Sequence, residues 1–123
     1  MPSNINRGPR QIWLAFMWSM KGLRAGWRIE ASFRLEVILL VILFPIGVWL
    51  GHGAVEKALL AGALLPVLAA ELLNSAIECV VDKLWPELHE LAGRAKDMGS
   101  AAVFLLMINV LVIWCVILIP RAF

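Results

Sequence analysis

The segment Ala69-Ala70-Glu71-Leu72-Leu73-Asn74-Ser75-Ala76-Ile77-Glu78-Cys79-Val80-Val81-Asp82 places acidic side chains at the end of a long apolar run. Its polar residues recur at steps of 3, 4 and 4: Glu71, Asn74, Glu78 and Asp82. These steps are the repeat of one helix face, and at about 100° per residue the row and Ser75 share an arc of roughly 100°. An ionisable side chain at membrane depth costs about 2.5–3.5 kcal/mol. Because helix stability does not require such groups, the row indicates a functional site.

The composition is that of a membrane protein. Hydrophobic residues make up 62% of the 123 residues, against about 45–50% in a soluble domain, and the mean hydropathy is +0.86. A soluble chain of this length has too little interior for so much apolar side chain. We expect a single membrane-embedded domain over residues 1–123. The net charge of +2 is too small to favour a nucleic-acid partner.

Three apolar runs predict an all-α protein with three transmembrane helices. The expected spans are about 31–50, 55–82 and 99–119. The basic residues set the orientation, since Lys and Arg are enriched in cytoplasmic segments. Six precede the first apolar run, which begins at Val37 (Arg7, Arg10, Lys21, Arg24, Arg28 and Arg34), and three lie between the second and third spans (Lys83, Arg94 and Lys96). We therefore expect a cytoplasmic N-terminus and a C-terminus outside.

Residues 9–28 predict a helix of another kind. Its apolar residues recur at steps of 4, 4, 3 and 4: Ile12, Phe16, Met20, Leu23 and Trp27. A separate face is basic: Arg10, Lys21, Arg24 and Arg28. This pattern is typical of an amphipathic helix that lies in the membrane surface. Two interpretations stay open, a plain orientation anchor and a helix that also bounds a site for a lipid or an anionic ligand.

The depth of each acidic residue suggests a separate role. If the cytoplasmic membrane boundary crosses the second helix near Ile77, with the helix continuing to Asp82, Glu71 lies roughly 9 Å inside the boundary. That is the depth of a hydroxyl on a lipid backbone. A partly desolvated Glu71 suits a general base. Glu78 at the boundary suits a hard cation such as Mg²⁺, with Glu30 as the second carboxylate. The alternative for Glu71 is a structural pair with a basic group of the bundle.

The segment 83–100 is expected to be a solvated link between the second and third spans. Two of its basic residues, Arg94 and Lys96, can bind phosphates. On the residues alone a solvated turn is the favoured interpretation.

Several segments resemble a known family, the small bacterial diacylglycerol kinases. Glu71-Leu72-Leu73-Asn74-Ser75-Ala76-Ile77-Glu78, followed by Val80-Val81-Asp82, is similar to the family signature. Gly93-Arg94-Ala95-Lys96-Asp97-Met98-Gly99-Ser100-Ala101-Ala102 is similar to a second block. Lys21-Gly22-Leu23-Arg24-Ala25 with Trp27 and Glu30, and Trp114-Cys115, also fit. The resemblance covers nearly the whole chain.

The resemblance implies a kinase of the bacterial inner membrane that phosphorylates diacylglycerol to phosphatidic acid with ATP. It also implies Mg²⁺ as cofactor and a homotrimer whose active sites are shared between subunits. By the matching positions, Glu71 is the catalytic base, and Glu30 and Glu78 are metal carboxylates that also face ATP. The other nucleotide-binding positions are Trp18, Glu87, His89, Lys96 and Asp97. The positions on the lipid side are Asn74, Ser100 and Trp114.

Two other functions compete with this one. The first is a polyprenol kinase of the same fold, acting on a lipid such as undecaprenol. The second is a non-enzymatic subunit in which the acidic row forms an ion path or assembly contacts. An ion path needs polar residues across the whole membrane, yet the face above Glu71 is apolar at Val67, Leu64 and Leu60. That asymmetry argues against a channel.

Overall fold

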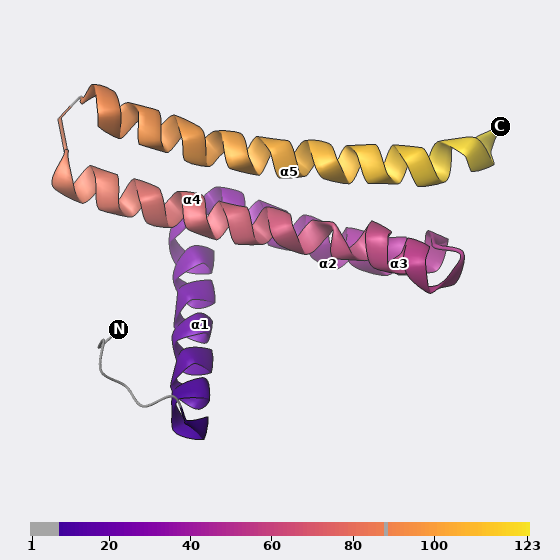
Figure 1. Cartoon of the computed structure of the whole chain (residues 1–123), viewed down its shortest axis with the longest axis horizontal. Coiled ribbons are helices and arrows are strands. Elements are labelled where there is room, and N and C mark those ends of the chain that lie inside the picture. Colours follow the sequence, from indigo (N-terminus) through magenta and orange to yellow (C-terminus); the bar gives the residue numbers. More distant parts are fainter. Residues whose placement is uncertain (1–7, 88) are drawn as a thin grey trace.

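The fold is a helical bundle with one helix set crosswise to it. The computed structural model describes residues 8–87 and 89–123, so Arg7 of the predicted basic N-terminal segment lies outside the described residues. The helical segments are α1 (Pro9–Ile29), α2 (Ala31–Leu50), α3 (Gly53–Gly62), α4 (Leu64–Leu84) and α5 (Glu90–Ala122). Figure 1 shows α4 and α5 side by side and antiparallel, with α2 behind α4 and α1 standing across them. The predicted all-helical fold class is confirmed for the described part of the chain.

Three stretches of helix are long and apolar enough to cross a membrane: Ala31–Leu50, Gly53–Leu84 and Glu90–Ala122. The chain itself buries only 11%, 28% and 6% of their most apolar windows. Most of the apolar surface therefore faces outward. A bilayer or neighbouring subunits would remove this surface from water, which a lone soluble chain cannot do.

The second candidate span, Gly53–Leu84, consists of α3 and α4, and Pro66 explains the break between these two helices. Proline has no N–H, and in an unbroken helix its ring collides with the carbonyl four residues earlier, here that of Gly62. Helix α3 ends at Gly62 and α4 begins at Leu64. Ala63 between them keeps helical dihedral angles, with φ −63° and ψ −20°. Helix α4 therefore continues in nearly the same direction as α3.

The turn from the surface helix into the first span is held by Arg34 of α2. Its Nη1 donates to the carbonyl oxygens of Trp27 at 2.9 Å and Arg28 at 3.3 Å. These carbonyls lie in the last turn of α1, where helical partners run out and a positive charge is favourable. Glu30 stands between the helices with extended angles, φ −106° and ψ 112°. The chain therefore changes direction at Glu30, directly after the end of α1.

The surface helix passes α4 beside Glu71. A Cβ added to Gly26 of α1 would lie 2.7 Å from Cδ2 of Leu72. The two helices therefore come together at the residue next to Glu71. The far end of the bundle is closed separately, by an ion pair between Arg121 and Glu56 and by a 2.6 Å hydrogen bond from Arg121 to the Leu50 carbonyl.

Candidate active site

The polar row of α4 runs from a buried end to an exposed end. Glu71, Asn74 and Ser75 are only 7%, 8% and 8% exposed, and they are the buried polar residues of the chain's described part. Glu78 is half-buried and Asp82 is exposed. The row therefore leads from the interior of the bundle out to solvent.

Four carboxyl groups from three parts of the chain converge on this row. The carboxyl group of Glu36, in α2, faces that of Glu71, and both Glu30 and Glu78 are close enough to Glu71 to interact with its charge. One oxygen of Glu36, Oε2, is buried without a hydrogen-bond partner. Neighbouring carboxylates repel one another, and a shared proton or a bound cation relieves that repulsion. The cluster is therefore built to exchange protons or to bind a cation.

Glu36 is the site residue that the sequence reasoning missed. It lies on α2, so it is outside the row of α4 and belongs to no periodic pattern of its own. One signal could have identified it, because it is a carboxylate inside an expected span, 31–50.

The donor atoms suit Mg²⁺ bound together with a phosphate ligand. Within the described residues, no three His, Cys, Asp or Glu side chains form a group that could hold a metal alone. Mg²⁺ does not need such a group, because it keeps water and phosphate oxygens and uses one or two carboxylates. Glu30 and Glu78, which both act on Glu71, supply two hard oxygen donors. The residues therefore fit the ion.

A lysine from α5 reaches the exposed end of the row. Lys96 Nζ lies 2.9 Å from Oδ1 of Asp82, and the two side chains are 39% and 61% exposed. The charges of Glu78 and Asp97 also act on Lys96. The structure thus places the Lys96 ammonium group at the open end of the row, where it pairs with Asp82 and where a cation can also bind a phosphate.

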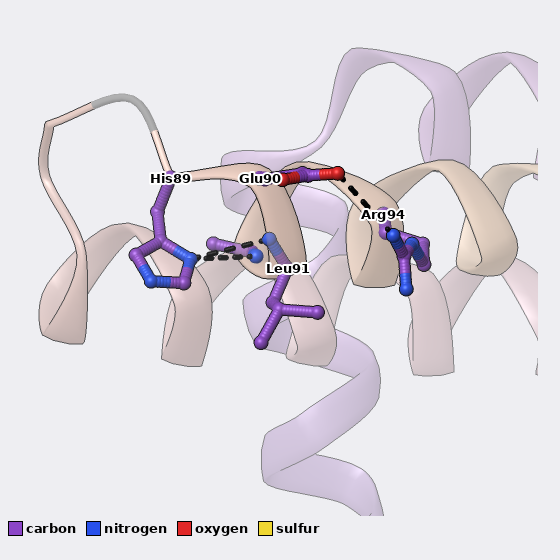
Figure 2. Close-up of polar contacts among 5 residues, drawn as sticks. His89, Glu90, Leu91 and Arg94 are labelled. Atoms are coloured by element: carbon purple, nitrogen blue, oxygen red, sulfur yellow. Dashed lines mark hydrogen bonds and ion pairs between the residues drawn. The ribbon is translucent and has the colours of Figure 1, made fainter.

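His89 has a structural task that its sequence position does not reveal. Its Nδ1 accepts hydrogen bonds from the backbone N–H groups of Leu91 at 3.2 Å and Ala92 at 3.4 Å, so it caps α5 (Figure 2). Beside it, Arg94 pairs with Glu90 at 3.5 Å (Figure 2). The predicted solvated turn over 83–100 is therefore wrong for residues 90–100, which are the first turns of α5. The cap explains the early start, because it satisfies N–H groups that have no helical partner.

The cap predicts a stability effect for His89. We expect His89→Ala to lower the free energy of unfolding by about 1 kcal/mol, because two N–H groups lose their acceptor. His89→Asn should restore most of the loss, since its side-chain oxygen can accept the same bonds. Thermal unfolding in detergent, followed by circular dichroism, measures both variants. Equal stability of the alanine and asparagine variants would show that the cap contributes nothing.

Other predicted site residues lie on α1, on α5 and in the link between α4 and α5. Trp114 Nε1 donates to the Leu60 carbonyl at 3.0 Å, about 21 Å along α5 from the exposed Ser100. Trp18 is half-buried on α1, about 18 Å along the helix from Glu30. Glu87 is exposed in the link between α4 and α5. Trp114 therefore lies well apart from Glu71, at the level of Leu60.

Together, the three helices long and apolar enough to span a membrane, the crosswise helix and the buried Glu71 in its polar row define a small membrane protein with a polar site at one end. The family model for prokaryotic diacylglycerol kinase matches residues 17–118. The chain is 45% identical to the diacylglycerol kinase of Escherichia coli K12 over 116 residues, which covers 94% of this chain and 95% of that one. It is 43% identical over 112 residues to the diacylglycerol kinase of Pseudomonas aeruginosa PAO1, covering 91% of each. The chain belongs to the prokaryotic diacylglycerol kinase family.

Family membership decides between the broad classes. The chain is an enzyme, a diacylglycerol kinase, so the non-enzymatic alternative falls away. The resemblance in sequence is confirmed, whereas the roles of the individual residues remain predictions.

Proposed function

We propose that Glu71 is the general base for transfer of the γ-phosphoryl group of ATP to the free hydroxyl of diacylglycerol. The observation that carries this assignment is the burial of Glu71 among the carboxyl groups of Glu30, Glu36 and Glu78. A buried carboxylate beside a polar row can take a proton from a lipid hydroxyl that approaches from the membrane. The hydroxyl oxygen then bonds to the γ-phosphorus, the bond to the leaving oxygen breaks, and ADP departs with phosphatidic acid as product.

The nucleotide would lie at the open end of the row. Glu30 and Glu78 would hold Mg²⁺, which would neutralise charge on the phosphates of ATP. Lys96 is placed to exchange its partner Asp82 for a phosphate oxygen. Asp97 adjoins Lys96, and Glu87 and His89 lie in the neighbouring link, so they are candidates for further nucleotide contacts.

The lipid would enter from the side, between the surface helix and α4. An apolar groove of about 520 Å³ runs there, lined in part by Gly22, Leu23, Ile29 and Leu72. Its lining also includes Glu30 and Ser75. An acyl chain in this groove would bring its glycerol backbone to the carboxylates, which supports a site open to both membrane and cytoplasm. The basic residues before the first span and in the link between α4 and α5 support an orientation with both segments on the cytoplasmic side of the bacterial inner membrane.

We propose a homotrimer with shared active sites, because a single chain leaves the predicted site residue Trp114 far from Glu71 and apolar surface uncovered. Trp114 is held at the Leu60 carbonyl, away from Glu71, and most of the apolar surface of the spans is uncovered. Packing of neighbouring subunits would cover that surface and could bring Trp114 to a partner's carboxylates. The family resemblance favours three subunits.

Transfer of labelled phosphate tests the substrate and the cofactor. Purified protein in detergent is given ATP labelled at the γ-phosphate, with dioleoylglycerol or undecaprenol, and with Mg²⁺ or EDTA. We expect Mg²⁺-dependent label in phosphatidic acid and little in undecaprenyl phosphate. Preferential labelling of undecaprenol would favour the polyprenol kinase, and label that persists in EDTA would contradict the metal role.

A further inference from the structure

Gly99 of α5 packs against Asn74 of the polar row with no space to spare. A Cβ added to Gly99 would lie 2.4 Å from Oδ1 of Asn74, and 3.4 Å from both Cγ of Asn74 and Cδ1 of Ile77. A carbon cannot approach an oxygen as closely as 2.4 Å, so the asparagine would have to move. Gly99 is buried, and α4 and α5 lie side by side here. Only glycine therefore leaves Asn74 in its observed place.

Each end of the Asn74 side-chain amide has a defined neighbour: Glu78 at the nitrogen and Gly99 at the oxygen. Its Nδ2 donates to Oε1 of Glu78 at 3.4 Å. A carboxylate only accepts hydrogen bonds, so the NH₂ end must face Glu78 and the oxygen must point away from it. That oxygen, Oδ1, is the atom against Gly99, where it is buried without a hydrogen-bond partner. The side chain is only 8% exposed, so it has little room for another arrangement.

Glu78 needs this support because another group competes for it. The charge of Lys96 lies close enough to interact with Glu78. Glu78 is half-buried, so solvent reaches part of its side chain and burial alone does not fix the carboxylate. The bond from Asn74 holds one oxygen towards the row of α4, where Glu71 lies.

We infer that Gly99 is a positioning residue that acts through Asn74 to orient the Glu78 carboxylate for Mg²⁺. This inference rests on the proposed role of Glu78 as a metal carboxylate. Groups that orient a metal ligand commonly change metal affinity by about 10- to 100-fold when they are removed. Loss of the glycine should therefore change the Mg²⁺ requirement of the enzyme.

The test is a mutant cycle measured against Mg²⁺. We expect Gly99→Ala and Asn74→Ala each to raise the half-saturating Mg²⁺ concentration by about tenfold. The double variant should be no worse than Asn74→Ala alone, because alanine at 74 removes both the clash and the hydrogen bond. Gly62→Ala is the matched control, since a Cβ at Gly62 meets nothing within 4 Å, and its Mg²⁺ requirement should not change.

A binding measurement separates positioning from a general loss of structure. Electron paramagnetic resonance of Mn²⁺, with a non-hydrolysable ATP analogue and full-length protein in detergent, should show the same weakening for both single variants. If Gly99→Ala does not fold, Asn74→Ala and the double variant still carry the test, because neither introduces a clash. Effects that add in the double variant, or unchanged Mn²⁺ binding in the single variants, would overturn the inference.

The Glu78→Gln variant distinguishes failure of the positioning role of Gly99 from failure of the proposed metal role of Glu78. If Glu78→Gln leaves Mn²⁺ binding intact, the metal role of Glu78 is wrong. If Glu78→Gln weakens binding while Gly99→Ala and Asn74→Ala do not, only the positioning role is wrong.

Discussion

Replacing Glu71 by glutamine should lower the turnover number for diacylglycerol phosphorylation by about 10²- to 10⁴-fold. Glutamine has nearly the same shape as glutamate but cannot take the proton of the lipid hydroxyl. The KM for ATP should change little, because the nucleotide is expected at the outer end of the row. Initial rates with γ-labelled ATP and dioleoylglycerol in mixed micelles measure both quantities.

Glu90→Gln is the matched control for this experiment. Glu90 lies on the surface at the start of α5, where its side chain is 87% exposed and pairs with Arg94. Its replacement removes the same charge and should leave the rate unchanged. Size-exclusion chromatography in detergent should show that Glu71→Gln assembles as the unaltered protein does. A Glu71→Gln variant with full activity would remove Glu71 from the role of base.

Replacing Glu78 by glutamine should lower activity at limiting Mg²⁺ by at least about 100-fold, because a metal ligand matters more than the groups that orient it. Part of the activity should return at high Mg²⁺, since Glu30 and the phosphates of ATP still offer oxygen donors. Titration of the rate with Mg²⁺ at saturating ATP measures the shift. Glu30→Gln should move the titration in the same direction.

The activities of Glu71→Gln and Glu78→Gln should respond differently to added Mg²⁺. Excess Mg²⁺ should restore Glu78→Gln in part and leave Glu71→Gln inactive, because a proton acceptor cannot be replaced by a cation. Restoration of Glu71→Gln by Mg²⁺ would instead assign Glu71 to the metal. A Glu78→Gln variant with an unaltered titration would exclude Glu78 from the metal site.

Much of the fold could be predicted because its signals are local. The 3.6-residue repeat predicts the surface helix over 9–28, and the structure has α1 over Pro9–Ile29. Apolar length predicts a first span over 31–50, where α2 is Ala31–Leu50. The third long helix begins at Glu90, ahead of the span expected over about 99–119. Polar residues hid its first turns, and the His89 cap depends on side-chain geometry that hydropathy does not record.

The candidate site also has a part that the sequence predicts and a part that depends on how the helices pack. Periodicity along one helix is enough to place Glu71, Asn74 and Glu78 on a common face, and the apolar run places that face at membrane depth. Which other groups meet this face depends on how the helices pack. Glu36 comes to Glu71 from α2, and Gly99 comes to Asn74 from α5. These contacts join residues far apart in the chain, so no local pattern predicts them.

The sequence by itself therefore determined the polar row, the family and three runs long and apolar enough to span a membrane. Those properties follow from hydropathy, helical repeat and motif, which are read along one segment at a time. Only the tertiary structure decided that four carboxyl groups share one end of the bundle, that Lys96 reaches Asp82, and that Trp114 is held at the Leu60 carbonyl. The physical reason is that such contacts are set by the packing of whole helices, including the close approaches that Gly26 and Gly99 allow.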